Sequence, residues 1–83
     1  MIDLNRAIEA SQEVLDAVND QYEYHPWDEE KIMKGKRVRQ ALQEAAVVII
    51  ENVPAGPDRS TALRKLREAR MDANSAITHD GKY

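Results

Sequence analysis

A cluster of basic residues follows closely after a group of aromatic residues. The bases are five within nine positions: Lys31, Lys34, Lys36, Arg37 and Arg39. The aromatic residues lie a few positions upstream: Tyr22, Tyr24 and Trp27. An aromatic ring can stack on a nucleobase, and a Lys or Arg side chain can bind a phosphate group. The two groups together are therefore chemically suited to a nucleotide-like anion.

A purely structural interpretation of these residues is at least as good on the pattern alone. In it, Tyr22 and Trp27 close the end of a helical core while the bases stay in water. Five further bases follow later in the chain: Arg59, Arg64, Lys65, Arg67 and Arg70. Glu68 and Asp72 lie among or beside these bases at helical spacing, so we expect local ion pairs for much of that set.

The charges are distributed unevenly along the 83 residues, although the net charge is only −3. Residues 1–30 contain nine acids and one base, and residues 31–83 contain eleven bases and six acids. Two solvated faces that attract each other would explain this distribution, and so would an anion-binding site on the basic part. Charge alone favours the first explanation.

No constellation of residues indicates catalysis. His25 and His79 are the only histidines, and neither accompanies a nucleophile, a metalloprotease motif or a phosphate-binding loop. The acids at 28–30 suit the dipole at a helix start better than a metal ion, and the absence of Cys excludes a thiolate metal site. We therefore expect no enzyme, no catalytic residue, no cofactor and no metal site.

Apolar spacing predicts an all-α chain with three helices. The first covers about residues 3–21, with Asp3 as its N-cap and one apolar seam. That seam is formed by Leu4, Ile8, Ser11, Leu15, Val18 and Tyr22. The second helix is expected to begin near Pro26, because proline suits the first helical position. Gly35 is a weak spot within it, at a cost of about 1 kcal/mol relative to Ala.

The break at residues 54–57 makes the second and third helices an antiparallel hairpin. The third helix is expected to open at Pro57 or Asp58 and to end before Asp80-Gly81, with Lys82 and Tyr83 frayed. So small a chain gains little from its own core, so we expect it to assemble as a homo-oligomer. We assign residues 1–21 to an N-terminal helix and residues 22–83 to the hairpin, within one domain overall.

Several segments in a fixed order carry a resemblance to a known family. Tyr24-His25-Pro26 is followed by Arg37-Val38-Arg39, by an Ala-rich stretch that ends at Pro54, and by ALRKLREARMDANSAI at residues 62–77. Over roughly residues 22–79 the chain resembles the helical hairpin domain of phage anti-CBASS and anti-Thoeris sponge proteins. It differs from the usual family pattern at Trp27, Asp72 and His79.

The resemblance implies a homo-oligomer, with a hexamer recurrent in the family. It implies pockets for cyclic dinucleotides between protomers and, in some members, separate sites for cyclic trinucleotides. By position, Tyr24 would stack on a base, beside His25 and Pro26. One of Lys36, Arg37 and Arg39 would hold phosphates, and His79 would stand where the second ligand type is contacted.

The resulting hypothesis is a phage protein in the host cytoplasm that sequesters cyclic oligonucleotide immune signals without degrading them. It would thereby block activation of the host CBASS effector, with no membrane or long nucleic acid as partner. Two alternatives stay open. One is a helical module that binds a protein or DNA, and the other is a sponge for cyclic ADP-ribose-type Thoeris signals.

Overall fold

The computed structural model describes residues 4–83, with side chains from residue 11 onward. The part described consists of three α-helices without strands: α1 (Leu4–Tyr22), α2 (Glu29–Asn52) and α3 (Pro57–Thr78). The all-α prediction is confirmed. The predicted N-cap Asp3 lies outside the described residues, as do the side chains of Leu4 and Ile8 in the predicted seam.

The start of α2 differs from the predicted one near Pro26. The helix begins at Glu29, and Asp28 is its N-cap with extended backbone (φ −76°, ψ 177°). The Asp28 carboxylate accepts a hydrogen bond from the backbone N–H of Lys31 at 2.9 Å. This cap satisfies a free amide of the first turn, which proline cannot do. Pro26 therefore belongs to the connection between α1 and α2.

The two ends of α3 follow the predicted turn chemistry. Pro57 occupies the first turn, after Gly56 at the N-cap. At the other end Asp80 and Gly81 adopt positive φ values of 53° and 75°, and the Gly81 N–H donates to the Ala76 carbonyl at 2.9 Å. The prediction of a frayed Tyr83 was wrong, because its hydroxyl donates to the Asp20 carboxylate at 2.6 Å.

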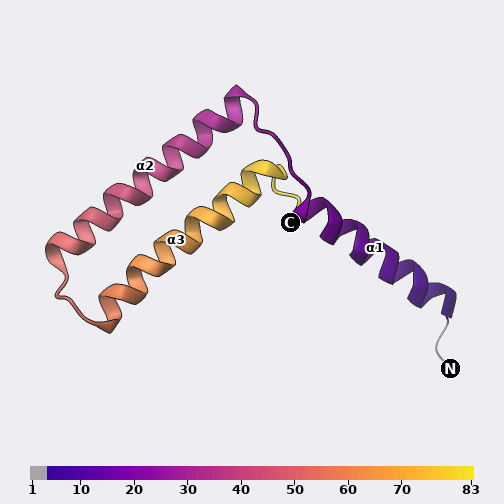
Figure 1. The fold of residues 1–83 in the computed structure, drawn as a ribbon, viewed down its shortest axis with the longest axis horizontal. Helices are drawn as coiled ribbons and strands as arrows, with labels where there is room; N and C mark the ends of the chain where they lie inside the picture. Colours follow the sequence, from indigo (N-terminus) through magenta and orange to yellow (C-terminus); the bar gives the residue numbers. More distant parts are fainter. Residues whose placement is uncertain (1–3) are drawn as a thin grey trace.

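Helices α2 and α3 lie side by side and are joined at one end by residues 53–56, whereas α1 extends away from this hairpin (Figure 1). At the open end of the hairpin, Trp27 Nε1 donates to Thr78 Oγ1 at 2.7 Å and Lys31 Nζ donates to the Thr78 carbonyl at 3.1 Å. These bonds hold the α1–α2 connection against the end of α3.

Gly35 on α2 permits the close approach of Trp27. It is the one buried residue of α2, and a Cβ built on it would overlap the Trp27 ring, with 2.6 Å to Cη2. Although glycine lowers helix propensity, the absence of a side chain at Gly35 leaves the space that the ring of the only tryptophan occupies. Its role could not be recognised from the helix pattern alone.

The single chain lacks an apolar core in the part whose side chains are described. No apolar side chain there is fully buried, and large ones such as Val48, Ile50 and Met71 are half or more exposed. The described helices also include none with the length and apolarity that crossing a bilayer requires. The described apolar residues that the helical spacing would place in a core are thus at most partly buried in the single chain.

Candidate functional site

A groove between α2 and α3 is lined by four basic side chains, Lys36, Arg39, Arg67 and Arg70. We use "inter-helix groove" for two adjoining cavities of about 180 and 280 Å³. The smaller cavity is lined by Trp27, Ile32, Gly35, Lys36, Arg39, Arg70 and Asn74. The larger is lined by Arg39, Leu42, Gln43, Ala46, Leu63, Leu66, Arg67 and Arg70. Arg39 and Arg70 are common to both cavities.

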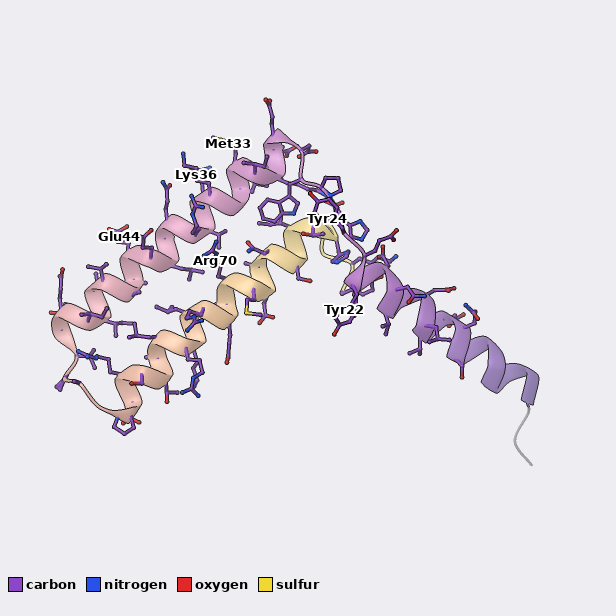
Figure 2. The ribbon with its side chains drawn as sticks, in the orientation of Figure 1. Tyr22, Tyr24, Met33, Lys36, Glu44 and Arg70 are labelled. Carbon is purple, nitrogen blue, oxygen red and sulfur yellow. The ribbon has the colours of Figure 1, made fainter. Side chains whose placement is uncertain are left out.

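The groove combines an apolar floor with cationic walls. Leucine and alanine side chains from both helices form the floor of the larger cavity. Lys36 on α2 and Arg70 on α3 are both seen in Figure 2. None of the described residues that line the two cavities is acidic. Such a surface can contact the face of a base and bind a phosphate with charge-assisted hydrogen bonds.

The sequence suggested that acidic neighbours neutralise many of the bases of α3, but the structure differs for two of them. Within residues 11–83, Arg67 and Arg70 form no ion pair with Glu68 or Asp72. A pair of helical turn spacing does form on α2, between Lys34 Nζ and Glu30 Oε1 at 2.9 Å. That carboxylate hydrogen bond raises the pKa of Lys34. Arg67 and Arg70 therefore remain available to an anion.

The structure divides the predicted site residues into separate places. Lys36 and Arg39 line the inter-helix groove, whereas Arg37 is exposed on α2 outside the groove lining. Tyr24 lies in the α1–α2 connection with 86% of its surface exposed (Figure 2), and Pro26 beside it is also exposed.

His25 and His79, 54 positions apart in the chain, meet at the junction of α1 with the hairpin. We use "junction cluster" for these two histidines with Asp20 and Tyr83. His25 Nε2 donates to the Asp20 carbonyl at 2.7 Å and lies 3.3 Å from Asp20 Oδ1. His79 Nδ1 lies 3.8 Å from Asp20 Oδ2. The two imidazole rings contact edge to face, with centroids 5.0 Å apart.

Asp20 is the charged centre of the junction cluster. Its pKa is held below the ordinary value chiefly by the hydrogen bond from Tyr83, with Lys82 and the two histidines adding attraction. The same hydrogen bond raises the pKa of the Tyr83 phenol. The carboxylate thus connects the end of α1, the following connection and the residues after α3.

Sequence reasoning grouped Trp27 with the aromatic residues suited to a nucleotide but did not place it among the predicted site residues, and it left Arg70 among bases expected to be paired. One signal was available for Arg70. In a hairpin, residues equally far from the loop lie opposite each other, and Arg39 precedes residues 53–56 by as many positions as Arg70 follows them. The same relation pairs Lys31 with Thr78, which are in contact.

Comparison with known proteins agrees with the helical arrangement. The family model described as Acb2/Tad1, hairpin domain, matches residues 15–78, well over half of the chain. No curated protein and no solved structure matched the sequence. The matched segment contains α2, α3 and the inter-helix groove. The family comprises anti-defence sponges for cyclic nucleotides, which bind their ligands and are not known as enzymes. This chain therefore belongs to the Acb2/Tad1 hairpin-domain family of anti-CBASS and anti-Thoeris sponges.

Proposed function

We propose that this protein binds and sequesters cyclic oligonucleotide immune signals of the host without degrading them. Cyclic dinucleotides are the first ligand class, with cyclic trinucleotides as a second. Capture of these signals in the host cytoplasm prevents activation of the CBASS effector. A sponge must compete with that effector, so we expect nanomolar affinity, equivalent to about −12 kcal/mol.

The observation that carries this proposal is the cationic inter-helix groove. Lys36, Arg39 and Arg70 line one cavity together with Trp27, and this combination of three cations with an aromatic ring supports the proposal. A cyclic dinucleotide presents two phosphates and two bases, and both kinds of group have partners in this groove. A ligand without negative charge would leave the clustered cations without an opposite charge to pair with.

The exposed apolar residues of the hairpin support a site shared between protomers. No apolar side chain in the described part is fully buried, and large ones such as Val48 and Met71 are half or more exposed, so they are free to pack against a second copy of the chain. We propose that the hairpins pack as antiparallel helix pairs in a homo-oligomer, favouring a hexamer as in the family. The remaining wall then comes from a neighbouring protomer, with the exposed Tyr24 ring as the base-stacking group.

The decisive experiment is a retention assay with a defined ligand panel. Tag-free protein is incubated with cyclic dinucleotides, cyclic trinucleotides and cyclic ADP-ribose, separated from free ligand, heated and analysed by chromatography. We expect saturable retention of a cyclic dinucleotide and its recovery intact. Breakdown products would contradict the absence of turnover. Retention of cyclic ADP-ribose alone would indicate that the protein is a sponge for Thoeris signals instead of CBASS signals.

A matched pair of variants tests whether the groove is the site. Arg70→Ala removes a groove cation from α3, and Arg64→Ala removes the same charge from an exposed position of α3 outside the groove lining. Loss of a charged hydrogen bond costs about 1.5–3 kcal/mol, so Arg70→Ala should weaken binding at least tenfold. Equal effects of the two variants would indicate non-specific attraction, as expected of a DNA-binding module.

A further inference from the structure

The junction cluster brings three metal-binding side chains together from different parts of the fold. Asp20 comes from the last turns of α1, His25 from the α1–α2 connection and His79 from the C-cap of α3. One donor atom from each residue lies within 4.8 Å of the other two. Neither histidine lines the inter-helix groove, so the cluster is separate from that groove.

The separations suit a transition-metal ion. Zn²⁺ binds imidazole nitrogen and carboxylate oxygen at about 2.0–2.2 Å, so two donors on one ion can be about 3.3–4.3 Å apart. Asp20 has one carboxylate oxygen 3.3 Å from His25 Nε2 and the other 3.8 Å from His79 Nδ1. The edge-to-face rings, with centroids 5.0 Å apart, are also spaced as two ligands of one tetrahedral ion, for which about 5 Å is expected.

His79 is well placed to be one of the ligands. Its side chain is only 6% exposed, and its Nδ1 lies 3.8 Å from Asp20 Oδ2. This distance is too long for a direct hydrogen bond, but it is within the range expected for two donors on one Zn²⁺ ion.

Two existing contacts must change when an ion binds, and both can. His25 Nε2 donates to the Asp20 carbonyl, and a shift of the ring proton to Nδ1 frees its lone pair without changing the charge of the imidazole. The ring must then turn away from the carbonyl toward the Asp20 carboxylate, whose Oδ1 lies 3.3 Å from Nε2. Lys82 Nζ lies 3.7 Å from Asp20 Oδ2, but its side chain is 67% exposed and can move into water. The Tyr83 hydroxyl can keep its hydrogen bond to the carboxylate, as is common for ligating carboxylates.

We propose that Asp20, His25 and His79 form a Zn²⁺ site that fixes α1 to the hairpin, with water in the fourth position. Two imidazoles with one carboxylate favour Zn²⁺ over Mg²⁺ or Ca²⁺, which prefer oxygen ligands. The three ligands come from three segments, so the ion joins parts of the chain that otherwise have few contacts. Its position leaves the groove open.

The test uses the tag-free full chain after treatment with a chelator. Calorimetric titration with zinc sulfate should show one ion per chain, and magnesium sulfate at the same concentration should show none. Cobalt(II) should give visible absorption bands of a tetrahedral nitrogen–oxygen site. Because the chain has only two histidines, ring nitrogen signals in NMR can be followed directly. Both rings should shift together at one equivalent of Zn²⁺.

Variants identify the ligands. His25→Gln, His79→Gln and Asp20→Asn should each weaken zinc binding at least about tenfold. Asp16→Asn is the matched control, because Asp16 is an exposed carboxylate one turn earlier on α1. The proposal is wrong if wild-type protein binds no zinc, if only one histidine ring shifts, or if Asp16→Asn weakens binding as much as Asp20→Asn. The NMR result on wild-type protein decides the matter even where a variant fails to fold.

Discussion

Tyr24 combines a large aromatic ring with 86% exposure in the α1–α2 connection. Such a ring contributes little to the stability of its own chain, so its replacement can be tested for binding alone. We expect Tyr24→Ala to weaken cyclic dinucleotide binding by about 1–3 kcal/mol, the cost of one stacking contact. Calorimetric titration beside a melting curve measures both effects. A variant with wild-type affinity, or one that merely unfolds, would remove Tyr24 from the site.

Arg39 is expected to fail in a different way from Tyr24. It lines both cavities of the inter-helix groove, and a phosphate contact depends on salt whereas stacking hardly does. Arg39→Ala should therefore lower the affinity and also flatten its dependence on salt concentration. Titrations at three salt concentrations, with Tyr24→Ala for comparison, distinguish the two roles. The same slope for both variants would contradict the assignment of Arg39 to phosphate.

Tyr83 lowers the pKa of Asp20 in the junction cluster. Its hydrogen bond is the largest cause of the lowered Asp20 pKa, so Tyr83→Phe should raise that pKa. A carboxyl group with a lowered pKa stabilises the fold at pH values above its ordinary, unfolded-state pKa. This stabilisation is lost as pH falls through the folded-state pKa. Carboxyl NMR signals, recorded with a chelator present, measure the Asp20 pKa during titration from neutral to acidic pH. An unchanged Asp20 pKa in the Tyr83→Phe variant would show that the hydrogen bond from Tyr83 does not lower it.

Gly35 determines how closely the α1–α2 connection packs on α2. We expect Gly35→Ala to displace the Trp27 ring from its seat and to break the bond to Thr78. Overpacking costs about 1–3 kcal/mol, which exceeds the helix propensity gained from Ala, about 1 kcal/mol. Urea unfolding at a fixed protein concentration should therefore give a lower free energy of unfolding.

Gly56 offers a matched control for this substitution. A Cβ there has nothing within 4 Å, and its backbone is extended with φ of 164°. Gly56→Ala should change the free energy of unfolding by less than about 0.5 kcal/mol. If Gly35→Ala is as well tolerated as Gly56→Ala, the close contact with Trp27 is not required for stability.

Local sequence signals predicted the helices better than the contacts between them. Pro57 and the Asp80-Gly81 pair marked the two ends of α3, because proline and positive-φ residues act through their own backbone. The start of α2 was misplaced, since Pro26 and Asp28 are both acceptable start signals and only the side chain of Asp28 reaches the free amide of Lys31.

The groove and the junction cluster could not be predicted from helical periodicity, because both depend on how distant segments of the chain are placed against each other. Arg39 was recognised from its neighbours in sequence, whereas Arg70 required the alignment of α3 on α2 across the loop. Asp20 is one of the nine acids in residues 1–30, and its neighbours in sequence do not distinguish it from the others. Its partners His79 and Tyr83 lie about sixty residues away, so only the folded junction of α1 with the hairpin shows that they meet.

The whole molecule is an open hairpin with a projecting helix, 58 × 36 × 16 Å in extent. No apolar side chain in its described part is fully buried, so a single chain gains little hydrophobic stabilisation. We predict a multimer, with a hexamer favoured by family membership, and a melting temperature that rises with protein concentration. Light scattering and melts across a dilution series measure both. A stable monomer at micromolar concentration would contradict this prediction.

The position of Trp27 allows its intrinsic fluorescence to report on the groove. The chain contains no other tryptophan, and this indole lines the inter-helix groove while its N–H is bonded to Thr78. A nucleobase that enters the groove should quench its emission, whereas opening of the hairpin should shift the emission to longer wavelength as the ring meets water. Ligand capture and loss of structure can therefore be followed in the unlabelled protein as two distinct optical signals.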